Sequence, residues 1–221
     1  MKQEEQTYFS ITDIINTALT NPKSFQGKNE LGQESDISLN VMSDLTYSNI
    51  WNSFTKWCMD QTELGFYLEI FMFCDMFYVS ERPCEGIVLS LSNYFLKEYG
   101  LTWDEENSPA NKQYQLKYAS NEPQKQKINY IAISGELNTK KIIVQNGLNN
   151  LFKAIGYLLE THSNCQIDLG VLGTLTSVNK LVSQTPNKVK GDAVMNKKTT
   201  IKSLIGRRKE AEEDQRTQQQ D

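Results

Sequence analysis

The sequence contains few side chains that could perform acid–base or nucleophilic chemistry. Catalysis near neutral pH commonly uses histidine, an activated cysteine, paired carboxylates or a metal ion. The only histidine is His162, which follows a strongly helical segment and precedes Ser163-Asn164. A cation at the C-terminal end of a helix interacts favourably with the helix dipole. We therefore interpret His162 as a helix-terminal residue, predict no catalytic residue, and expect a protein that is not an enzyme.

The cysteines are too widely spaced for a zinc site, which needs ligands at short helical or knuckle spacing. Three of the four lie in or beside apolar runs, which is typical of buried free thiols in a reducing compartment. We expect neither a disulfide framework nor a bound metal. The four are Cys58, Cys74, Cys84 and Cys165.

Two glycines, Gly170 and Gly173, could suggest a phosphate-binding loop. That loop requires Lys-Ser or Lys-Thr after its second glycine, followed by a helix. Here Thr174-Leu175-Thr176 follows and continues as a strand. We predict no nucleotide and no cofactor, and we interpret Gly170, Gly173 and Thr174 as a fold motif. The acidic run Asp104-Glu105-Glu106 is interpreted as a solvated charge run.

The C-terminal segment carries the one candidate binding feature. The chain has a net charge of −4, but residues 186–209 hold eight basic residues and one acid, and residues 210–221 hold five acids and one arginine. Ile201, Leu204 and Ile205 alternate with the charges, which favours an amphipathic helix docking on an acidic protein. A solvated tail and a nucleic-acid partner remain alternatives. The candidate partner-binding residues are Lys197, Lys198, Lys202, Arg207, Arg208 and Lys209.

The first part of the chain predicts a compact unit preceded by a short helix. Apolar spacing predicts helices over 9–20 and 46–60, the second with Trp51 and Trp57 on a packed face. Residues 22–42 are polar and are interpreted as a linker. The run 66–79 is rich in aromatic and β-branched residues and predicts one long or two short strands. Residues 87–99 are expected to be helical, with Gly100 after the last turn.

A second unit follows a polar connection at 104–126, in which Tyr114 to Tyr118 alternate like a short edge strand. The alternation at 128–134 predicts a strand ending at Gly135. The wide apolar stripe over 142–159 is the clearest helical signal in the chain, and Gly147 near its start favours two helices that meet at a bend. Strands are predicted at 166–169 and 174–178, on either side of the glycines.

The segment QIDLGVLGTLTSV at 166–178 resembles the HU-like fold, in which two helices precede a strand, a glycine-containing turn and another strand. Two such units, joined near NYIAISGEL at 129–137, resemble the eukaryotic coiled-coil domain-containing 81 family. The resemblance implies an α+β chain of two tandem HU-like (IHF-like) domains with flexible or partner-ordered terminal segments. The expected divisions are an N-terminal segment 1–43, a divergent domain 44–104, a linker 105–126, a domain 127–185 and a tail 186–221.

Bacterial HU proteins bind DNA with a long β-arm that carries basic residues and a wedging proline. The matching region is 179–191, which contains Lys180, Pro186, Lys188 and Lys190 but shows no alternating pair of strands. The acidic body of the chain also opposes DNA binding. A nucleic-acid-binding HU relative is therefore the alternative, and nucleic acid is not the expected partner.

The resemblance to the eukaryotic family implies a centrosomal or ciliary protein. Within that context we expect a structural subunit of axonemal doublet microtubules that binds tubulin and other axonemal proteins, inside the microtubule lumen or outside it. The most hydrophobic run, 64–79, is shorter than a membrane span and contains Glu69 and Asp75. The polar start MKQEEQT, with no apolar run after it, predicts that there is no signal peptide. The expected location is the axoneme and the cytoplasmic cytoskeleton, without a membrane partner.

Overall fold

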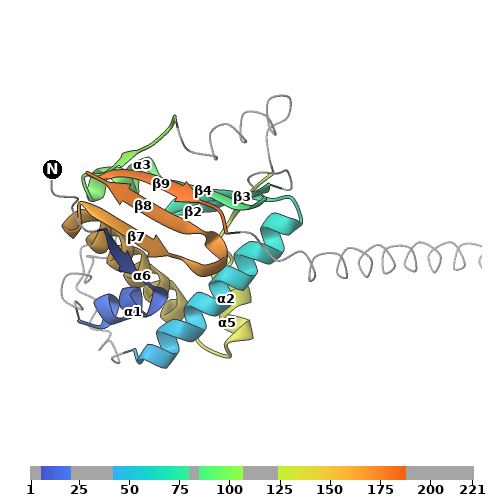
Figure 1. Cartoon of the computed structure of the whole chain (residues 1–221). Coiled ribbons are helices and arrows are strands. Elements are labelled where there is room, and N and C mark those ends of the chain that lie inside the picture. The colour runs from blue at the N-terminus through green and yellow to red at the C-terminus, as the bar shows by residue number, and fades with distance from the viewer. Residues whose placement is uncertain (1–5, 21–41, 80–84, 107–123, 188–221) are drawn as a thin grey trace, which may run out of the picture. The chain divides into compact units, whose positions relative to one another are not determined.

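The computed structural model describes residues 6–20, 42–79, 85–106 and 124–187, which all belong to one compact unit (Figure 1). The first half comprises β1 (Thr7–Phe9), α1 (Ile11–Thr20), α2 (Asp44–Glu63), β2 (Tyr67–Ile70), β3 (Cys74–Val79), β4 (Gly86–Leu91), α3 (Asn93–Glu98) and β5 (Thr102–Trp103). The second half comprises β6 (Lys125–Lys127), α5 (Tyr130–Glu136), α6 (Lys141–Thr161), β7 (Asn164–Asp168), the 3₁₀ turn η1 (Gly170–Leu172), β8 (Thr174–Val178) and β9 (Leu181–Thr185).

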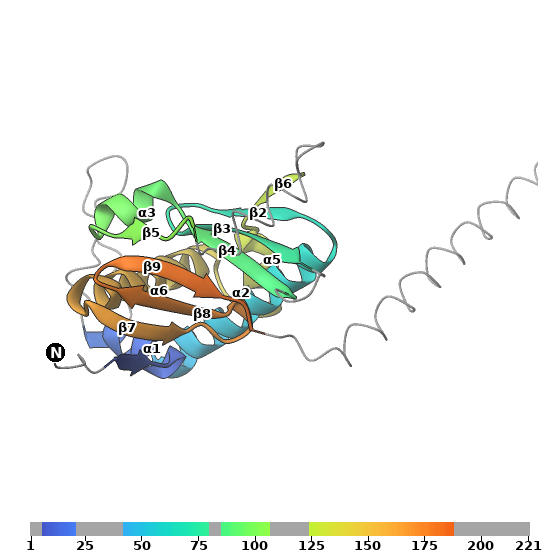
Figure 2. The same ribbon diagram turned by 45° about the horizontal axis from the view of Figure 1, so that its top comes forward.

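The strands form two sheets, and each sheet contains strands from both halves. A five-stranded sheet has the order β1-β7-β8-β9-β5, and a four-stranded sheet has the order β4-β3-β2-β6. The hairpin strands within each half pair antiparallel. β1 and β6 instead pair in parallel with strands of the opposite half (Figure 2).

This exchange of strands is reciprocal. β1 precedes α1 and pairs with β7, the strand that follows α6, through the partners Tyr8 and Gln166. β6 precedes α5 and pairs with β2, the strand that follows α2, through the partners Gln126 and Leu68. Each half therefore places its leading strand on the first hairpin strand of the other half, so neither sheet is completed by one half alone.

Helices α2 and α6 pack together and supply more residues to the buried core than any other helix. Phe152 of α6 stacks on Phe73 at 4.4 Å between ring centroids and meets Phe54 of α2 edge to face at 5.6 Å. All three rings are buried, and such aromatic pairs add about 0.5–1.5 kcal/mol beyond the burial of their area. One buried cluster runs from Ile14 in α1 to Val182 in β9, so both halves share a core.

Two glycines of α6 allow other elements to approach closely. A Cβ added at Gly147 would lie 2.6 Å from Ile50 Cδ1, and one added at Gly156 would overlap the ring of Tyr99. Real Cβ atoms do not come so near. These glycines therefore mark the places where α2 and the end of α3 meet the surface of α6.

Several predictions from local sequence are confirmed. The helix expected at 9–20 is α1, and the one at 46–60 is α2, which Ser43 caps by accepting a hydrogen bond from the backbone N–H of Thr46. The run 66–79 forms two short strands, β2 and β3. The strands predicted around the glycines are β7 and β8. The expected mixture of helices and strands is thus correct.

Three predictions about local structure are wrong. Residues 87–99 begin as β4 rather than helix, because β3 offers an antiparallel edge and Ser92 starts the short helix α3 only afterwards. Residues 128–134 form no strand; Asn129 caps α5 by accepting from the N–H of Ala132. Residues 142–159 lie within one continuous helix, α6, and Gly147 allows the close contact with Ile50 instead of ending a helix.

Some of the predicted segment boundaries can be compared with the observed helices and strands, and others cannot. The segment 1–43 contains β1 and α1, whose Ile14 and Ile15 are buried in the shared core. The linker 105–126 includes the start of β6, and its predicted edge strand at 114–118 lies outside the described residues, as does the linker at 22–42. The division into domains 44–104 and 127–185 stays a prediction. Within the described ranges, no helix is long and apolar enough to cross a membrane.

Candidate functional site

The glycine turn between β7 and β8 is the first candidate site. Gly170 and Gly173 have φ angles of +68° and +95°, in the region that residues with a Cβ rarely adopt. The backbone N–H of Leu169 donates to the carbonyl of Gly173 at 2.9 Å, and Asp168 Oδ1 accepts from the N–H of Gly170 at 2.9 Å. The turn thus reverses the chain between β7 and β8, and β8 begins at Thr174.

The glycine turn is tied to both halves by Gln184 of β9. Its side chain is only 2% exposed, and Nε2 donates to the carbonyls of Ile87 in β4 and Leu172 in η1, each at 3.1 Å. A Cβ at Gly173 would lie 2.5 Å from that Nε2 atom. Gly173 is therefore required by the close approach of Gln184 as well as by its backbone conformation.

A hollow of about 270 Å³ lies beside the glycine turn, between it and the start of α1. Tyr8 donates from its hydroxyl to Asp168 Oδ2 at 3.1 Å, and this bond is the main cause that raises the Tyr8 pKa. Both oxygens of Asp168 thus hold structural hydrogen bonds. The hollow is lined by Ser10, Ile11, Trp51, Asn52, Thr55, Asp168, Leu169, Gly170 and Val171.

The side chains around the glycine turn do not form a reactive set. In the described ranges, no group of three or more His, Cys, Asp or Glu residues could hold a metal ion. His162 is the residue after α6, as expected, where its ring contacts Phe9 edge to face at 4.8 Å. The turn therefore connects elements of the two halves and presents no arrangement for acid–base chemistry.

The described cysteines are buried free thiols, as the sequence predicted. Burial raises the pKa of Cys58 and of Cys74 well above the ordinary thiol value, and it raises the pKa of Cys165 to about 11. A thiol held in its protonated form is a poor nucleophile. Cys84 lies outside the described residues.

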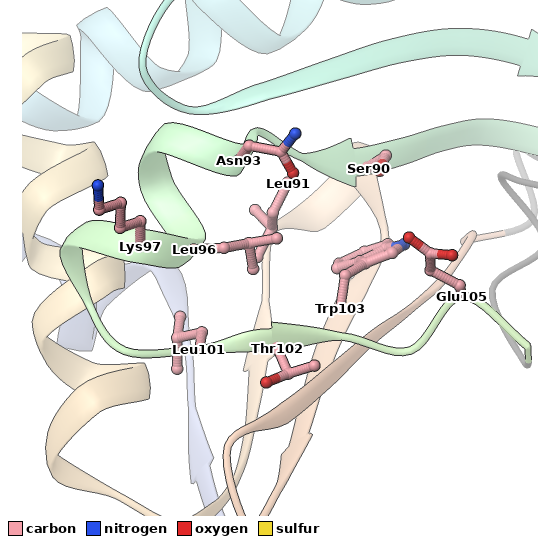
Figure 3. Close-up of a pocket in the computed structure, with 9 residues that line it drawn as sticks. All are labelled: Ser90, Leu91, Asn93, Leu96, Lys97, Leu101, Thr102, Trp103 and Glu105. Atoms are coloured by element: carbon pink, nitrogen blue, oxygen red, sulfur yellow. The ribbon is translucent and has the colours of Figure 1, made fainter.

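A second candidate site is the cleft between β4 and β5, which has a volume of about 400 Å³. Trp103 rises from β5 into the space toward β4, and Leu96 of α3 and Leu91 of β4 point into the same space (Figure 3). Glu105 and Lys97 lie at its rim (Figure 3). The cleft is lined by Ser90, Leu91, Asn93, Leu96, Lys97, Leu101, Thr102, Trp103 and Glu105.

Trp103 in this cleft carries an unusual buried polar group. The residue is 8% exposed, and its indole N–H is buried without a hydrogen-bond partner. Leaving a buried donor unpaired costs about 1–3 kcal/mol. Sequence reasoning missed this cleft, although a tryptophan directly before Asp104-Glu105-Glu106 was a visible signal.

The described surface is acidic. The described residues include eight lysines, no arginine and fourteen carboxylates, which gives a net charge of −6. One row across the outer face of the five-stranded sheet consists of the paired, uncharged residues Tyr8, Gln166, Thr176 and Ser183. Nucleic-acid-binding surfaces usually carry clustered Lys and Arg, and no such cluster lies on this row.

The hairpin that corresponds to the DNA-binding arm is a tight turn. β8 and β9 are joined by Asn179 and Lys180 alone, and both have positive φ angles, of 52° and 67°, as in a two-residue type I′ hairpin. Residues 181–185, where the sequence suggested no paired strand, form β9. The described part of 179–191, residues 179–187, therefore consists mainly of a tight turn and the sheet strand β9, and not of an extended arm.

The predicted partner-binding residues Lys197, Lys198, Lys202, Arg207, Arg208 and Lys209 all lie outside the described residues. Their role stays a prediction. Of the described candidates, the structure brings Gly170, Gly173 and Thr174 together in one turn.

Comparison with known protein families matches residues 124–185 to the model of CCDC81 eukaryotic HU domain 2. The matched segment runs from the residue before β6 to the end of β9 and contains the glycine turn. The second half is thus similar to an HU domain of that family, and its fold is HU-like. No curated protein matches the chain.

Proposed function

We propose that this chain is a non-enzymatic structural protein that acts by binding other proteins. The observation that carries the proposal is the combination, in one HU-like half, of the family match at 124–185 with a two-residue turn where a DNA-binding arm would extend. The acidic described surface favours protein partners over nucleic acid.

We also propose that the chain holds two HU-like units that pair with each other. Both halves run in the same order: a leading strand, two helices and three strands. The reciprocal pairing of β1 with β7 and of β6 with β2 is what two equivalent units would produce. In this proposal the first unit takes the place of a second subunit, as an internal partner to the second unit.

For the cellular role, we propose a structural component of the ciliary axoneme, associated with doublet microtubules on their inner surface. The support is the similarity of 124–185 to the CCDC81 family together with the ciliary context which that resemblance implies. Tubulin and neighbouring axonemal proteins are the proposed partners. The basic residues from Lys197 to Lys209 would meet the acidic surfaces of those partners.

The experiment is to express the tagged full chain in a ciliated cell and to extract the isolated axonemes with detergent and then with high salt. Signal along the cilium that resists both extractions supports a built-in doublet component. A diffuse or nuclear signal rejects the axonemal role. Reversing the charge of Lys197, Lys198, Lys202, Arg207, Arg208 and Lys209 should weaken retention, whereas reversing Lys180 alone should not.

The alternative is an HU relative that binds nucleic acid. It predicts a mobility shift of duplex DNA by the purified chain at low salt, with an affinity that falls steeply as salt rises. We expect no such shift at about 50 mM salt at micromolar protein. A salt-dependent shift would reject protein binding as the main role.

A further inference from the structure

The hollow beside the glycine turn is built by both halves of the chain. The start of α1 and the middle of α2 form its wall from the first half, and residues 168–171 form its wall from the second. Its volume of about 270 Å³ lies below the range of roughly 300–1,000 Å³ that is typical of small-molecule pockets. A space of this size suits a single side chain of another protein.

The corresponding place in the other half is occupied by aromatic side chains. Helix α2 begins the same number of residues before β2 as α6 begins before β7, so Thr55 holds in α2 the position that Phe152 holds in α6. Phe152 stacks on Phe73, which lies in the turn between β2 and β3. Because Thr55 and the glycine turn are smaller than the residues of that contact, space is left beside them.

The lining of the hollow combines apolar walls with one charge. Ile11, Trp51 and Val171 supply apolar surface, and Val171 is 39% exposed. Asp168 is the only ionisable residue among those that line the hollow. The side chains of lysine and arginine have the two matching parts, an aliphatic stem that packs on apolar surface and a charged end. Complementary charge favours such a cation over a neutral or acidic side chain.

The carboxylate of Asp168 remains available to such a cation. The Tyr8 hydroxyl and the Gly170 N–H are neutral donors, one to each carboxylate oxygen, and each oxygen can accept a second hydrogen bond. These two bonds also fix the orientation of the carboxylate. Within the described ranges, no lysine forms an ion pair with Asp168, and Lys56 of α2 pairs with Glu136 at 2.6 Å instead.

We propose that the hollow beside the glycine turn binds a single lysine or arginine side chain of a partner protein. The stem lies against Ile11, Trp51 and Val171, and the cationic group meets the carboxylate of Asp168. Arginine is enriched among the residues that carry most of the binding energy at protein interfaces. The site goes beyond the proposed axonemal role and does not depend on it, because that role rests on the basic residues from Lys197 to Lys209.

The first test measures whether the full chain binds the cationic side chain itself. The probes are N-acetyl-arginine amide and N-acetyl-lysine amide, and N-acetyl-citrulline amide, which resembles arginine in shape but has no charge, is the neutral comparison. In protein labelled with 5-fluorotryptophan, the ¹⁹F resonance missing from Trp51→Phe identifies Trp51. We expect the cationic probes to shift this resonance until it saturates, and citrulline to bind at least about tenfold more weakly.

Two variants separate the charge of the hollow from its shape. Asp168→Asn keeps an oxygen for the Gly170 N–H but removes the charge, and it should weaken both cationic probes about tenfold or more. Thr55→Phe, which gives α2 the residue that α6 has, should fill the hollow and abolish the shift while Asp168 stays in place. Glu160→Gln is the matched control, because Glu160 is exposed on α6 and does not line the hollow. If Thr55→Phe does not fold, the comparison of Asp168→Asn with Glu160→Gln still decides.

The second test asks what the hollow holds in a ciliated cell. The photoreactive residue p-benzoylphenylalanine replaces Asn52, which is exposed and lines the hollow, and mass spectrometry locates the cross-links. We expect cross-links close to a lysine or arginine of another protein, and fewer of them in Asp168→Asn. Equal binding of the citrulline and cationic probes, equal effects of Asp168→Asn and Glu160→Gln, or cross-links only to copies of this chain would each overturn the proposal.

Discussion

Gln184 of β9 donates a hydrogen bond from Nε2 to the backbone carbonyl of Ile87 in β4, at 3.1 Å, across 97 positions of the sequence. The bond connects the last strand of the second half to the last hairpin strand of the first. Both residues are buried, so no water replaces this bond if it is lost. Gln184 therefore connects the five-stranded sheet to the four-stranded sheet beside the glycine turn.

Replacing Gln184 with leucine should lower the free energy of unfolding by about 1–3 kcal/mol, because the carbonyls of Ile87 and Leu172 lose their shared donor in a buried place. Urea titration followed by circular dichroism measures the change. Gln166→Leu is the control, since Gln166 lies half-buried on the outer face of β7. If both variants lose the same free energy of unfolding, the hydrogen bond between Gln184 and Ile87 adds no stability.

Two helical glycines should respond to alanine in opposite directions. Gly135→Ala in α5 should stabilise the protein by up to about 1 kcal/mol, because a Cβ there meets nothing within 4 Å and alanine favours helix. Gly156→Ala in α6 should destabilise it, because the new methyl overlaps the ring of Tyr99. Thermal melting compares the two. In Tyr99→Ala/Gly156→Ala, the second substitution should cost less than it does alone; strictly additive effects would contradict the contact.

Within the glycine turn, Gly173→Ala should destabilise more than Gly170→Ala. Both positions have positive φ, which costs an L-residue about 1 kcal/mol or more, and Gly173 also has a ψ of −166°, a combination that essentially only glycine adopts. Only Gly173 also faces Gln184 Nε2 and the Thr185 carbonyl, each 2.5 Å from an added Cβ, whereas Gly170 faces open space. Chemical unfolding of the two variants gives the comparison. Equal losses would mean that the backbone conformation alone requires glycine at Gly173.

Stability at alkaline pH should depend on Cys165. Burial raises its thiol pKa from 9.0 to about 11, so the folded chain holds this proton more tightly than the unfolded chain. The resulting stability is complete below pH 9 and is lost as the pH rises through about 11. Between pH 8 and pH 10, the wild type should lose about 1 kcal/mol more than Cys165→Ala in urea titrations. Parallel pH profiles for the two proteins would contradict this prediction.

Helix α2 and the strands β7 and β8 could be predicted because their signals are local. Ser43 caps α2 and the buried residues of that helix recur at helical spacing, while Gly170 and Gly173 mark a turn that only glycine adopts easily. The predictions that failed rested on local sequence that fits either a helix or a strand. Residues 87–99 are apolar enough for helix or strand, and β3 decided the outcome by offering an edge.

Of the candidate sites, the glycine turn was visible in the sequence and the cleft was not. Gly170 and Gly173 are close neighbours along the chain, so their spacing alone revealed them. The cleft joins Leu91 of one sheet with Trp103 of the other, and no local pattern reports which strands become edges. Only the arrangement of the two sheets shows that the indole N–H of Trp103 is buried without a hydrogen-bond partner.

The amino-acid sequence by itself determined the long helices, the tight glycine turn, the buried thiols and the HU-like character of the second half, because each rests on residues near one another in the chain. Only the tertiary structure decided that β1 and β6 cross to the opposite half and that Gln184 reaches Ile87. A strand of three residues such as β1 has too little periodicity to predict its own pairing. Its partner is chosen by the hydrogen-bonding edge and apolar surface that the rest of the fold presents.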